Sequence, residues 1–281
     1  MKIRQFYELA KQTLPKADEK CLRSEVNALL EYYLKLDLTQ LILSQERELT
    51  ESELEKLKKA LELRKNNVPL QYILGSWSFM NLDFKVGSGV LIPREDTAAL
   101  VNIVLPRLNS VAKPKILDLC SGSGAVAITI EKNAPEAQVY ALERSDDALK
   151  YLRKNVKNLK SNVKVIKGDV FKDYEKFEES YFDFIVSNPP YIKTDDINRL
   201  EKEVLKEPKM ALDGGKDGLD FYKAICKYWH SKLKIGGCLA FEIGIGMFED
   251  VKNIMTDSGF TDIEFMKDIN EIIRSVIGIK R

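Results

Sequence analysis

From Lys115 to the end of the chain, short apolar runs alternate with amphipathic stretches. This alternation constrains the fold most, because parallel strands need long crossover connections and these are usually helices. We expect strands at 116–119, 138–142, 163–167, 182–187 and 238–243, helices at 125–133, 146–159 and 221–233, and closing strands near 262–267 and 272–279. The pattern predicts a doubly wound α/β sheet, whose ligands bind outside the carboxyl ends of its strands.

Residues 1–75 have a different pattern and predict a small helical domain. Thr50 and Glu53 form a capping box that begins one helix. An earlier amphipathic helix is marked by Val26, Leu29, Leu30, Tyr33 and Leu34. Such a block serves either packing and oligomerisation or substrate recognition, and we favour recognition. The basic residues of its last long helix could contribute to this recognition or could form a solvated face. They are Lys56, Lys58, Lys59, Arg64 and Lys65.

Residues 76–92 read as a β-hairpin that links the two domains. Aromatic and aliphatic residues stand at strand spacing on both sides of Met80-Asn81, a candidate turn. Gly87-Ser88-Gly89 follows, and Pro93 to Thr97 then lead into a helix through about Leu108. The remaining residues, 93–281, would form the sheet domain.

The segment Asp118-Leu119-Cys120-Ser121-Gly122-Ser123-Gly124 lies between the first strand of this sheet and its helix. Gly122 and Gly124 allow a ligand to approach the backbone closely. Ala127 completes a G-x-G-x-x-A pattern, so a dinucleotide site is one alternative. However, the Asp118 carboxylate would repel a pyrophosphate and attract an ammonium group. The loop therefore favours S-adenosylmethionine, which has an ammonium, a sulfonium and no phosphate.

Two further acids stand at the ends of the next two strands. Glu143 can accept hydrogen bonds from both ribose hydroxyls of a nucleoside. Asp169 is placed for the adenine amine, with Val170 and Phe171 beside the ring. Alone, each acid could be a solvated loop residue or a helix cap. Together they predict one methyl-donor pocket at the edge of the sheet.

The tetrapeptide Asn188-Pro189-Pro190-Tyr191 follows the fourth strand. Prolines donate no backbone hydrogen bond and hold φ near −65°. The Asn188 side-chain oxygen and the Pro189 carbonyl can therefore accept both hydrogens of a planar NH2 group, beside the Tyr191 ring. We expect no titrating group in this pocket, which suits alkylation by an activated donor. The alternative is a strand-terminating turn with a partly buried tyrosine.

Composition excludes several classes of function. The chain has 44 basic and 43 acidic residues, a net charge of +1, which argues against a broad nucleic-acid footprint. His230 is the only histidine and the four cysteines are scattered, so we expect no metal site. The absence of an apolar run of about 18 residues and of an N-terminal apolar stretch predicts a cytoplasmic protein without membrane contact.

Several motifs together resemble the release factor glutamine methyltransferase family, within the class I S-adenosylmethionine-dependent methyltransferases that modify NH2 groups. They are 69–75 (PLQYILG), 91–97 (LIPREDT), 118–124, 187–192 (SNPPYI), Glu207-Pro208 and 217–220 (DGLD). The resemblance implies the Rossmann-like class I methyltransferase fold. It also implies methylation of the glutamine amide in the Gly-Gly-Gln motif of bacterial class 1 peptide chain release factors, with S-adenosylhomocysteine as coproduct.

The matching motifs carry the family's roles onto this chain. The cofactor-binding residues would be Asp118, Cys120, Ser121, Gly122, Ser123, Gly124, Glu143, Asp169, Val170 and Asn188, and the substrate-holding residues Asn188, Pro189, Pro190 and Tyr191. The chain departs from the usual pattern in having Glu143 for Asp, Glu95 for Pro and Met247 for Gln. We expect a monomer with a release factor as partner and no direct nucleic-acid contact.

Two other functions remain open on the sequence. One is methylation of adenine or cytosine in nucleic acid, which uses the same tetrapeptide but needs a flipped base and phosphate contacts. The other is a donor-binding module or RNA-associated scaffold without catalysis. Labelled methyl transfer to a protein would separate the second from an enzyme.

Overall fold

The structure is a computed structural model that describes residues 1–14 and 18–281. Residues 15–17, inside the range expected to be helical, lie outside the described part. The chain divides into two compact units, one made of Met1–Gly75 with Lys202–Lys206 and the other of Ser76–Glu201 with Glu207–Arg281.

The first unit is helical. Its elements are α1 (Ile3–Thr13), α2 (Glu19–Leu34), α3 (Leu38–Leu43), α4 (Glu51–Lys65) and α5 (Leu70–Leu74). The predicted capping box is confirmed, since Thr50 Oγ1 accepts the Glu53 N–H at 3.2 Å and Glu53 Oε2 accepts the Thr50 N–H at 2.9 Å. The core of this unit collects one apolar stripe from each long helix, including Phe6, Val26, Leu29, Leu30 and Leu57.

Arg64 does not belong to the exposed basic face of α4. Its side chain is 6% exposed, and it donates two hydrogen bonds to the Glu25 carboxylate at 3.0 and 2.8 Å. A third hydrogen bond reaches Glu203 at 2.6 Å. Lys56, Lys58 and Lys59 are exposed. The exposed basic residues of α4 are therefore all lysines, because Arg64 is used inside the unit.

The second unit begins with the predicted hairpin. Strands β1 (Ser76–Phe79) and β2 (Leu82–Lys85) pair in antiparallel fashion. Met80 and Asn81 have φ values of 45° and 64°, as a two-residue turn of type I′ requires. Phe79 and Phe84 are buried in a core cluster of the sheet domain, so the hairpin is part of this unit.

The sheet of the second unit has seven strands in the order β5-β4-β3-β6-β7-β9-β8. Their bounds are β3 Lys115–Leu119, β4 Gln138–Glu143, β5 Lys164–Lys167, β6 Phe182–Ser187, β7 Leu233–Glu242, β8 Phe260–Lys267 and β9 Ile273–Lys280. The first five strands run parallel, and β9 is antiparallel to both of its neighbours. The chain turns from one side of β3 to the other at β6, which places a ligand site where the strand order reverses.

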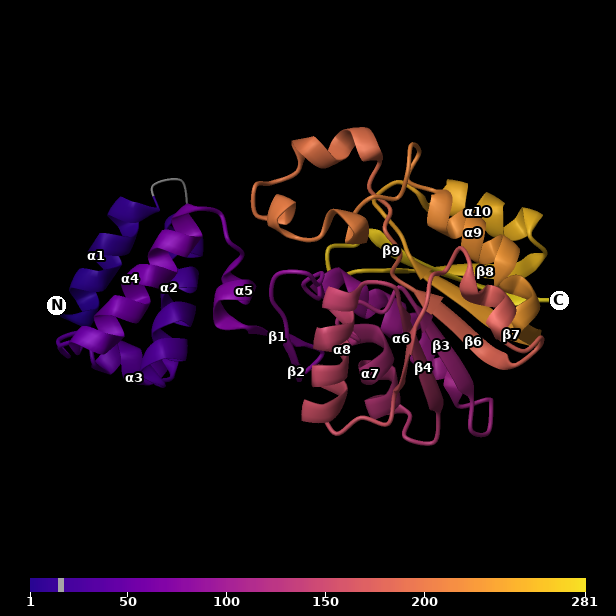
Figure 1. Cartoon of the computed structure of the whole chain (residues 1–281), viewed down its shortest axis with the longest axis horizontal. Helices are drawn as coiled ribbons and strands as arrows, with labels where there is room; N and C mark the ends of the chain where they lie inside the picture. The colour runs from indigo at the N-terminus through magenta and orange to yellow at the C-terminus, as the bar shows by residue number, and fades with distance from the viewer. Residues whose placement is uncertain (15–17) are drawn as a thin grey trace. The chain divides into compact units, whose positions relative to one another are not determined.

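Helices cover both faces of this sheet (Figure 1). They are α6 (Ala98–Leu108), α7 (Ala125–Asn133) and α8 (Asp146–Asn158) on one face, and α9 (Asp220–Tyr228) and α10 (Phe248–Asp257) on the other. Strand β3 is buried on both faces, because Ile116 packs toward the first helix layer and Leu117 toward the second. Apolar runs without polar alternation follow from this double burial.

Short 3-10 turns occupy the connections. They are η1 (Glu95–Thr97), η2 (Asp173–Lys176), η3 (Thr194–Arg199), η4 (Val204–Lys206), η5 (Lys209–Ala211) and η6 (His230–Lys232). Three of them, η3 to η5, lie in the long connection between β6 and α9.

One helix is shorter than the sequence predicts. We expected a helix over 221–233, but α9 ends at Tyr228, His230 lies in η6, and β7 begins at Leu233. Leu233 pairs with Phe182 in the sheet. The extended backbone is preferred there because sheet pairing with β6 outweighs the local helical pattern, which a single sequence cannot show.

Among the residues that the structure describes, no helix combines the length and the apolar character needed to cross a membrane.

Candidate active site

A cavity that is partly open to solvent lies at the carboxyl ends of the parallel strands. Its walls come from residues 89–94 and 97, the loop after β3, the end of β4, residues 168–170, Asn188 with Pro190, and the segment from Pro208 to Ala211. It therefore gathers four of the predicted strand ends and two segments that the sequence did not place there.

The loop after β3 is held in an unusual backbone conformation. Cys120, Gly122 and Gly124 have φ values of 61°, 55° and 83°. A positive φ at a non-glycine residue such as Cys120 is uncommon and marks a constrained loop. Cys120 to Ser123 line the cavity, whereas Gly124 does not and is the N-cap residue of α7.

Asp118 is buried in the cavity wall. Its Oδ2 accepts the N–H of Ala127 at 3.2 Å. Burial raises the pKa of Asp118 to about 8, against the lowering effect of hydrogen bonds from Ser121 and Ala127, while the Glu143 charge adds to the rise. A carboxyl in this state is stabilised in its charged form by a nearby cation, so the site fits a ligand with an ammonium group.

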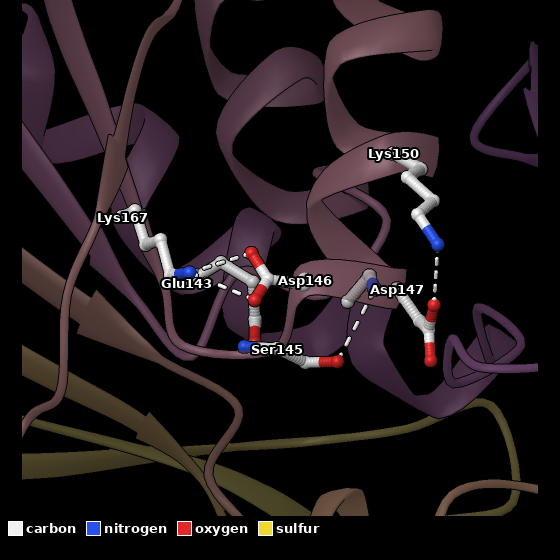
Figure 2. Close-up of polar contacts among 7 residues, drawn as sticks. Glu143, Ser145, Asp146, Asp147, Lys150 and Lys167 are labelled. Atoms are coloured by element: carbon white, nitrogen blue, oxygen red, sulfur yellow. Dashed lines mark hydrogen bonds and ion pairs between the residues drawn. The ribbon is translucent and has the colours of Figure 1, made fainter.

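Glu143 ends β4 and braces the loop after β3. Its Oε2 accepts the Gly122 N–H at 2.8 Å and its Oε1 accepts the Ser145 N–H at 2.7 Å. Figure 2 shows that the nearby Lys167 pairs with Asp146 instead, at 2.6 and 2.8 Å. Each carboxylate oxygen keeps a second lone pair, so Glu143 can still accept hydroxyl protons from a ligand.

Asp169 and Val170 form the wall beyond β5. Asp169 Oδ1 accepts the Phe171 N–H at 3.0 Å, and Arg144 Nη1 lies 3.5 Å from Oδ2. The Phe171 ring, expected beside a bound base, packs edge-on against Phe221 at 4.9 Å between centroids. Phe221 lines the cavity and Phe171 does not. Sequence reasoning missed Phe221, because α9 reaches this site only through the tertiary fold.

Asn188 and Pro190 line the cavity beyond β6, while Pro189 and Tyr191 do not. Ser187 Oγ donates to the Leu119 carbonyl at 2.7 Å, which ties the end of β6 to the end of β3. Asn188 Nδ2 donates to Thr97 Oγ1 at 3.2 Å. The predicted substrate-holding asparagine thus lies in the same cavity as Asp118.

The Tyr191 hydroxyl, whose ring we expected against a substrate, donates to Glu242 Oε1 at 3.3 Å. Burial raises the pKa of Tyr191, and the charge of Glu242 adds to this. Burial also raises the pKa of Glu242 to about 7, although hydrogen bonding from Thr97 and the charge of Arg274 lower it. A titrating group, Glu242, thus contacts Tyr191, although neither residue lines the cavity. The only sequence signal was an acid at the end of an apolar strand.

Glu207 joins two walls of the cavity. Its Oε2 accepts the Ile92 N–H at 2.9 Å, and its Oε1 pairs with Arg94. Burial raises the pKa of Glu207, against the lowering effects of Arg94 and the Ile92 amide. These contacts hold Pro208 and Met210 in the cavity wall. They give a structural reason for the motifs 91–97 and Glu207-Pro208, to which sequence analysis assigned no role.

Two family profiles match the chain. A profile described as the methyltransferase small domain matches residues 94–217, and one described as the PrmC N-terminal domain matches residues 5–75. The second match coincides with the helical unit.

Curated relatives resemble the chain over most of its length. A release factor glutamine methyltransferase of Thermodesulfovibrio yellowstonii is 42% identical over 258 residues, which cover 90% of this chain and 91% of the relative. A protein of the same name from Clostridium acetobutylicum is 38% identical over 284 residues, which cover 100% of this chain and 99% of the relative.

Solved structures share the fold at low identity. A methyltransferase from Pyrococcus furiosus gives a TM-score of 0.53 at 18% identity and covers 82% of this chain and 99% of that one. The Thermus thermophilus 16S rRNA N2 G1207 methyltransferase, solved with AdoMet and guanosine, gives a TM-score of 0.52 at 18% identity. The match covers 73% of this chain and 50% of that one. The expected Rossmann-like methyltransferase fold is confirmed by this likeness together with the sheet order.

Proposed function

The chain belongs to the release factor glutamine methyltransferase family, and we propose that it methylates the glutamine side-chain amide in the Gly-Gly-Gln motif of bacterial class 1 release factors, with S-adenosylmethionine as donor. The observation that carries this proposal is the position of Asn188. It lines one cavity together with Asp118, Glu143 and Asp169, so an amide acceptor and a nucleoside-binding set face the same space.

The donor would be held by the strand-end acids. Asp118 would pair with its ammonium group, Glu143 would accept the ribose hydroxyl protons, and Asp169 would accept from the adenine amine. Cys120 to Ser123 would contact it through a loop that Glu143 already braces. When bound, the donor supplies a methyl group activated by its attachment to a sulfonium.

Asn188 and the Pro189 carbonyl would accept the two hydrogens of the glutamine amide. An amide nitrogen is a poor nucleophile, because its lone pair is delocalised into the carbonyl. Two acceptors in fixed positions would orient that nitrogen at about 3 Å from the methyl carbon and stabilise the positive charge that grows on it. The nitrogen can lose a proton after methyl transfer, so the first step needs no base in contact with the substrate.

Mass spectrometry of a release factor incubated with the full-length protein and labelled donor tests this function. We expect one labelled methyl group on the motif glutamine, and none on a release factor in which glutamate replaces that glutamine. Asn188→Ala should lower turnover by about 100-fold or more while donor affinity changes little. An unmodified release factor would refute the substrate, and full turnover in the variant would refute the role of Asn188.

The helical unit would dock the release factor, because one glutamine in a loop gives the cavity little to recognise. Support comes from the match of this unit to the PrmC N-terminal profile and from the exposed lysines of α4. We expect the double variant Lys58→Glu/Lys59→Glu to raise KM for the release factor and leave donor affinity unchanged.

A matched control for this docking test is Arg153→Glu/Lys154→Glu, the same charge change at exposed positions of α8. Equal effects of the two double variants on KM would contradict a docking role for α4.

A further inference from the structure

We infer that Thr97 and Glu242 are positioning residues that decide which end of the Asn188 amide faces the cavity, and thereby favour a carboxamide substrate over a carboxylate. This inference rests on the proposed function, because it assumes that Asn188 contacts the substrate amide.

The Asn188 side chain has two chemically different ends. With Oδ1 toward the cavity it accepts hydrogen bonds from an NH2 group, and with Nδ2 toward the cavity it donates to a carboxylate. The hydrogen bond from Nδ2 to Thr97 Oγ1, at 3.2 Å, corresponds to the first arrangement. A hydroxyl can both donate and accept, so Thr97 alone does not enforce it.

Glu242 decides whether the Thr97 hydroxyl donates or accepts toward Asn188. Its Oε1 accepts the Tyr191 hydroxyl at 3.3 Å, while its Oε2 is buried and has no hydrogen bond of normal geometry in the described structure. Thr97 and Glu242 are both buried, and hydrogen bonding from the Thr97 hydroxyl favours the charged form of this carboxylate. A buried acceptor without a partner is costly, so the Thr97 proton is drawn toward Glu242.

The consequence for Asn188 follows from proton count. An ionised carboxylate only accepts, and the single Thr97 proton is then committed to Glu242. The lone pairs of Thr97 Oγ1 remain for Asn188, which must present Nδ2 to them. Oδ1 is left to face the cavity. When Glu242 is charged, the hydrogen bonds therefore run in one direction, with Asn188 donating to Thr97 and Thr97 donating to Glu242.

Other charged and titrating groups surround Glu242. Arg274 of β9 favours the charged form and Asp96 of η1 opposes it, and these two residues pair with each other at 2.7 Å. Asp268 pairs with the same arginine at 3.2 Å. The Tyr222 hydroxyl of α9 donates to the Glu242 backbone carbonyl at 2.9 Å and not to its carboxylate.

The charge of Glu242 is therefore sensitive to pH. Its pKa is about 7, so the carboxyl gains a proton as the pH falls below that value. A protonated carboxyl can donate to Thr97, and the hydroxyl proton of Thr97 can then turn toward Asn188. The preference for Oδ1 in the cavity would be lost on the acid side.

The first test replaces Thr97. We expect Thr97→Val, which keeps the shape and removes the hydroxyl, to lower kcat on a release factor by about 10- to 100-fold, since the partly buried Asn188 Nδ2 loses its partner. Donor affinity, measured by calorimetry, should change by about twofold or less, because Asp118, Glu143 and Asp169, which would hold the donor, are not altered. Thr97→Ser should restore most of the rate. A wild-type kcat in Thr97→Val would overturn the inference.

The second test measures amide selection without catalysis. Competition binding compares a release factor with the motif glutamine and one with glutamate at that position. We expect the wild-type protein to prefer glutamine, and Thr97→Val and Glu242→Gln to reduce the preference by about 10-fold. We also expect the kcat of the wild-type protein to fall below about pH 7, and the Glu242→Gln variant to lack this fall.

The wild-type protein alone keeps the test decisive if a variant does not fold. Its preference for glutamine should decline between about pH 8 and 6, on either side of the Glu242 pKa of about 7. A preference that is absent or constant over this range would sink the inference. A wild-type protein that prefers glutamine in binding but transfers no methyl group would instead contradict the proposed function.

Discussion

Glu143 Oε2 accepts the backbone N–H of Gly122 at 2.8 Å, which joins the carboxylate at the end of β4 to the glycine loop after β3. Sequence reasoning assigned these two residues separate contacts with a donor. The structure shows that one side chain shapes the loop and faces the cavity at the same time.

Replacing Glu143 should therefore weaken donor binding through both effects. We expect Glu143→Gln to lower the affinity for S-adenosylmethionine by about 10- to 100-fold, because a Gln NH2 would meet one of the two backbone N–H donors. Asp146→Asn is the control, since that acid is exposed and pairs with Lys167 (Figure 2). Calorimetry that gives both variants the same affinity would contradict the double role.

The raised pKa of Asp118 makes donor affinity depend on pH. Its pKa is about 8 in the folded protein against an ordinary value of 3.8. Binding of an ammonium group requires the charged carboxylate, so affinity should rise up to about tenfold per pH unit between roughly pH 6 and 7.5, below the pKa of an α-amino group. Titration calorimetry would test this, and a flat profile like that of Asp118→Asn would refute it.

The same pKa predicts a change in stability of the free protein. The folded state keeps the Asp118 proton up to about pH 8, whereas the unfolded state loses it near 3.8. The contribution of this group to the free energy of unfolding should therefore fall as the pH rises between those values. Denaturant unfolding should show Asp118→Asn gaining stability relative to wild type with rising pH; no relative change would contradict burial of the acid.

Glu207 should hold Pro208, Met210 and Ala211 in the wall of the cavity. Glu207→Ala leaves the Ile92 N–H and the Arg94 guanidinium without their shared acceptor. We expect the free energy of unfolding to drop by about 1–3 kcal/mol and the segment 193–219 to become more sensitive to limited proteolysis. The exposed Glu201, replaced by Ala, serves as control. Equal cleavage rates in the two variants would argue against this contact as the clamp.

The two loop glycines should separate stability from donor binding. A Cβ at Gly124 would lie 2.4 Å from the Leu152 Cδ1 atom in the core, whereas at Gly122 no atom lies within 4 Å of it. Gly124→Ala should destabilise the fold by about 1–3 kcal/mol. Gly122→Ala should cost about 1 kcal/mol, from its positive φ, and should reduce donor affinity more. Thermal unfolding would measure the loss of stability and calorimetry the loss of donor affinity. A larger loss of stability in Gly122→Ala, or a larger loss of donor affinity in Gly124→Ala, would contradict these roles.

The local elements were predictable where one physical signal dominates. Helix α7 has the expected bounds, Ala125–Asn133, and β6 the expected Phe182–Ser187. Both are bounded by strong local features, a glycine loop before the helix and a proline pair beyond the strand. The region around Leu233 was not predictable, because its strand state depends on pairing with Phe182, far away in the sequence.

The donor-side residues were also accessible from the sequence, because successive parallel strands end at one edge and bring Asp118, Glu143 and Asp169 together. The assignment of roles to them remains a proposal. The supporting residues were not accessible. Thr97 and Phe221 reach the cavity from a connection and a helix, and Glu207 holds Ile92 and Arg94 of its wall. No periodicity in the sequence links these residues to the cavity.

The amino-acid sequence by itself determined the order of strands and helices, the family and the strand ends that bear polar side chains, since these depend on local patterns and short motifs. The tertiary structure alone decided that Glu242 lies buried beside Tyr191 and that Thr97 meets Asn188. Burial and hydrogen-bond direction set the charge of an acid and the orientation of an amide, and both depend on neighbours that only the folded chain brings into contact.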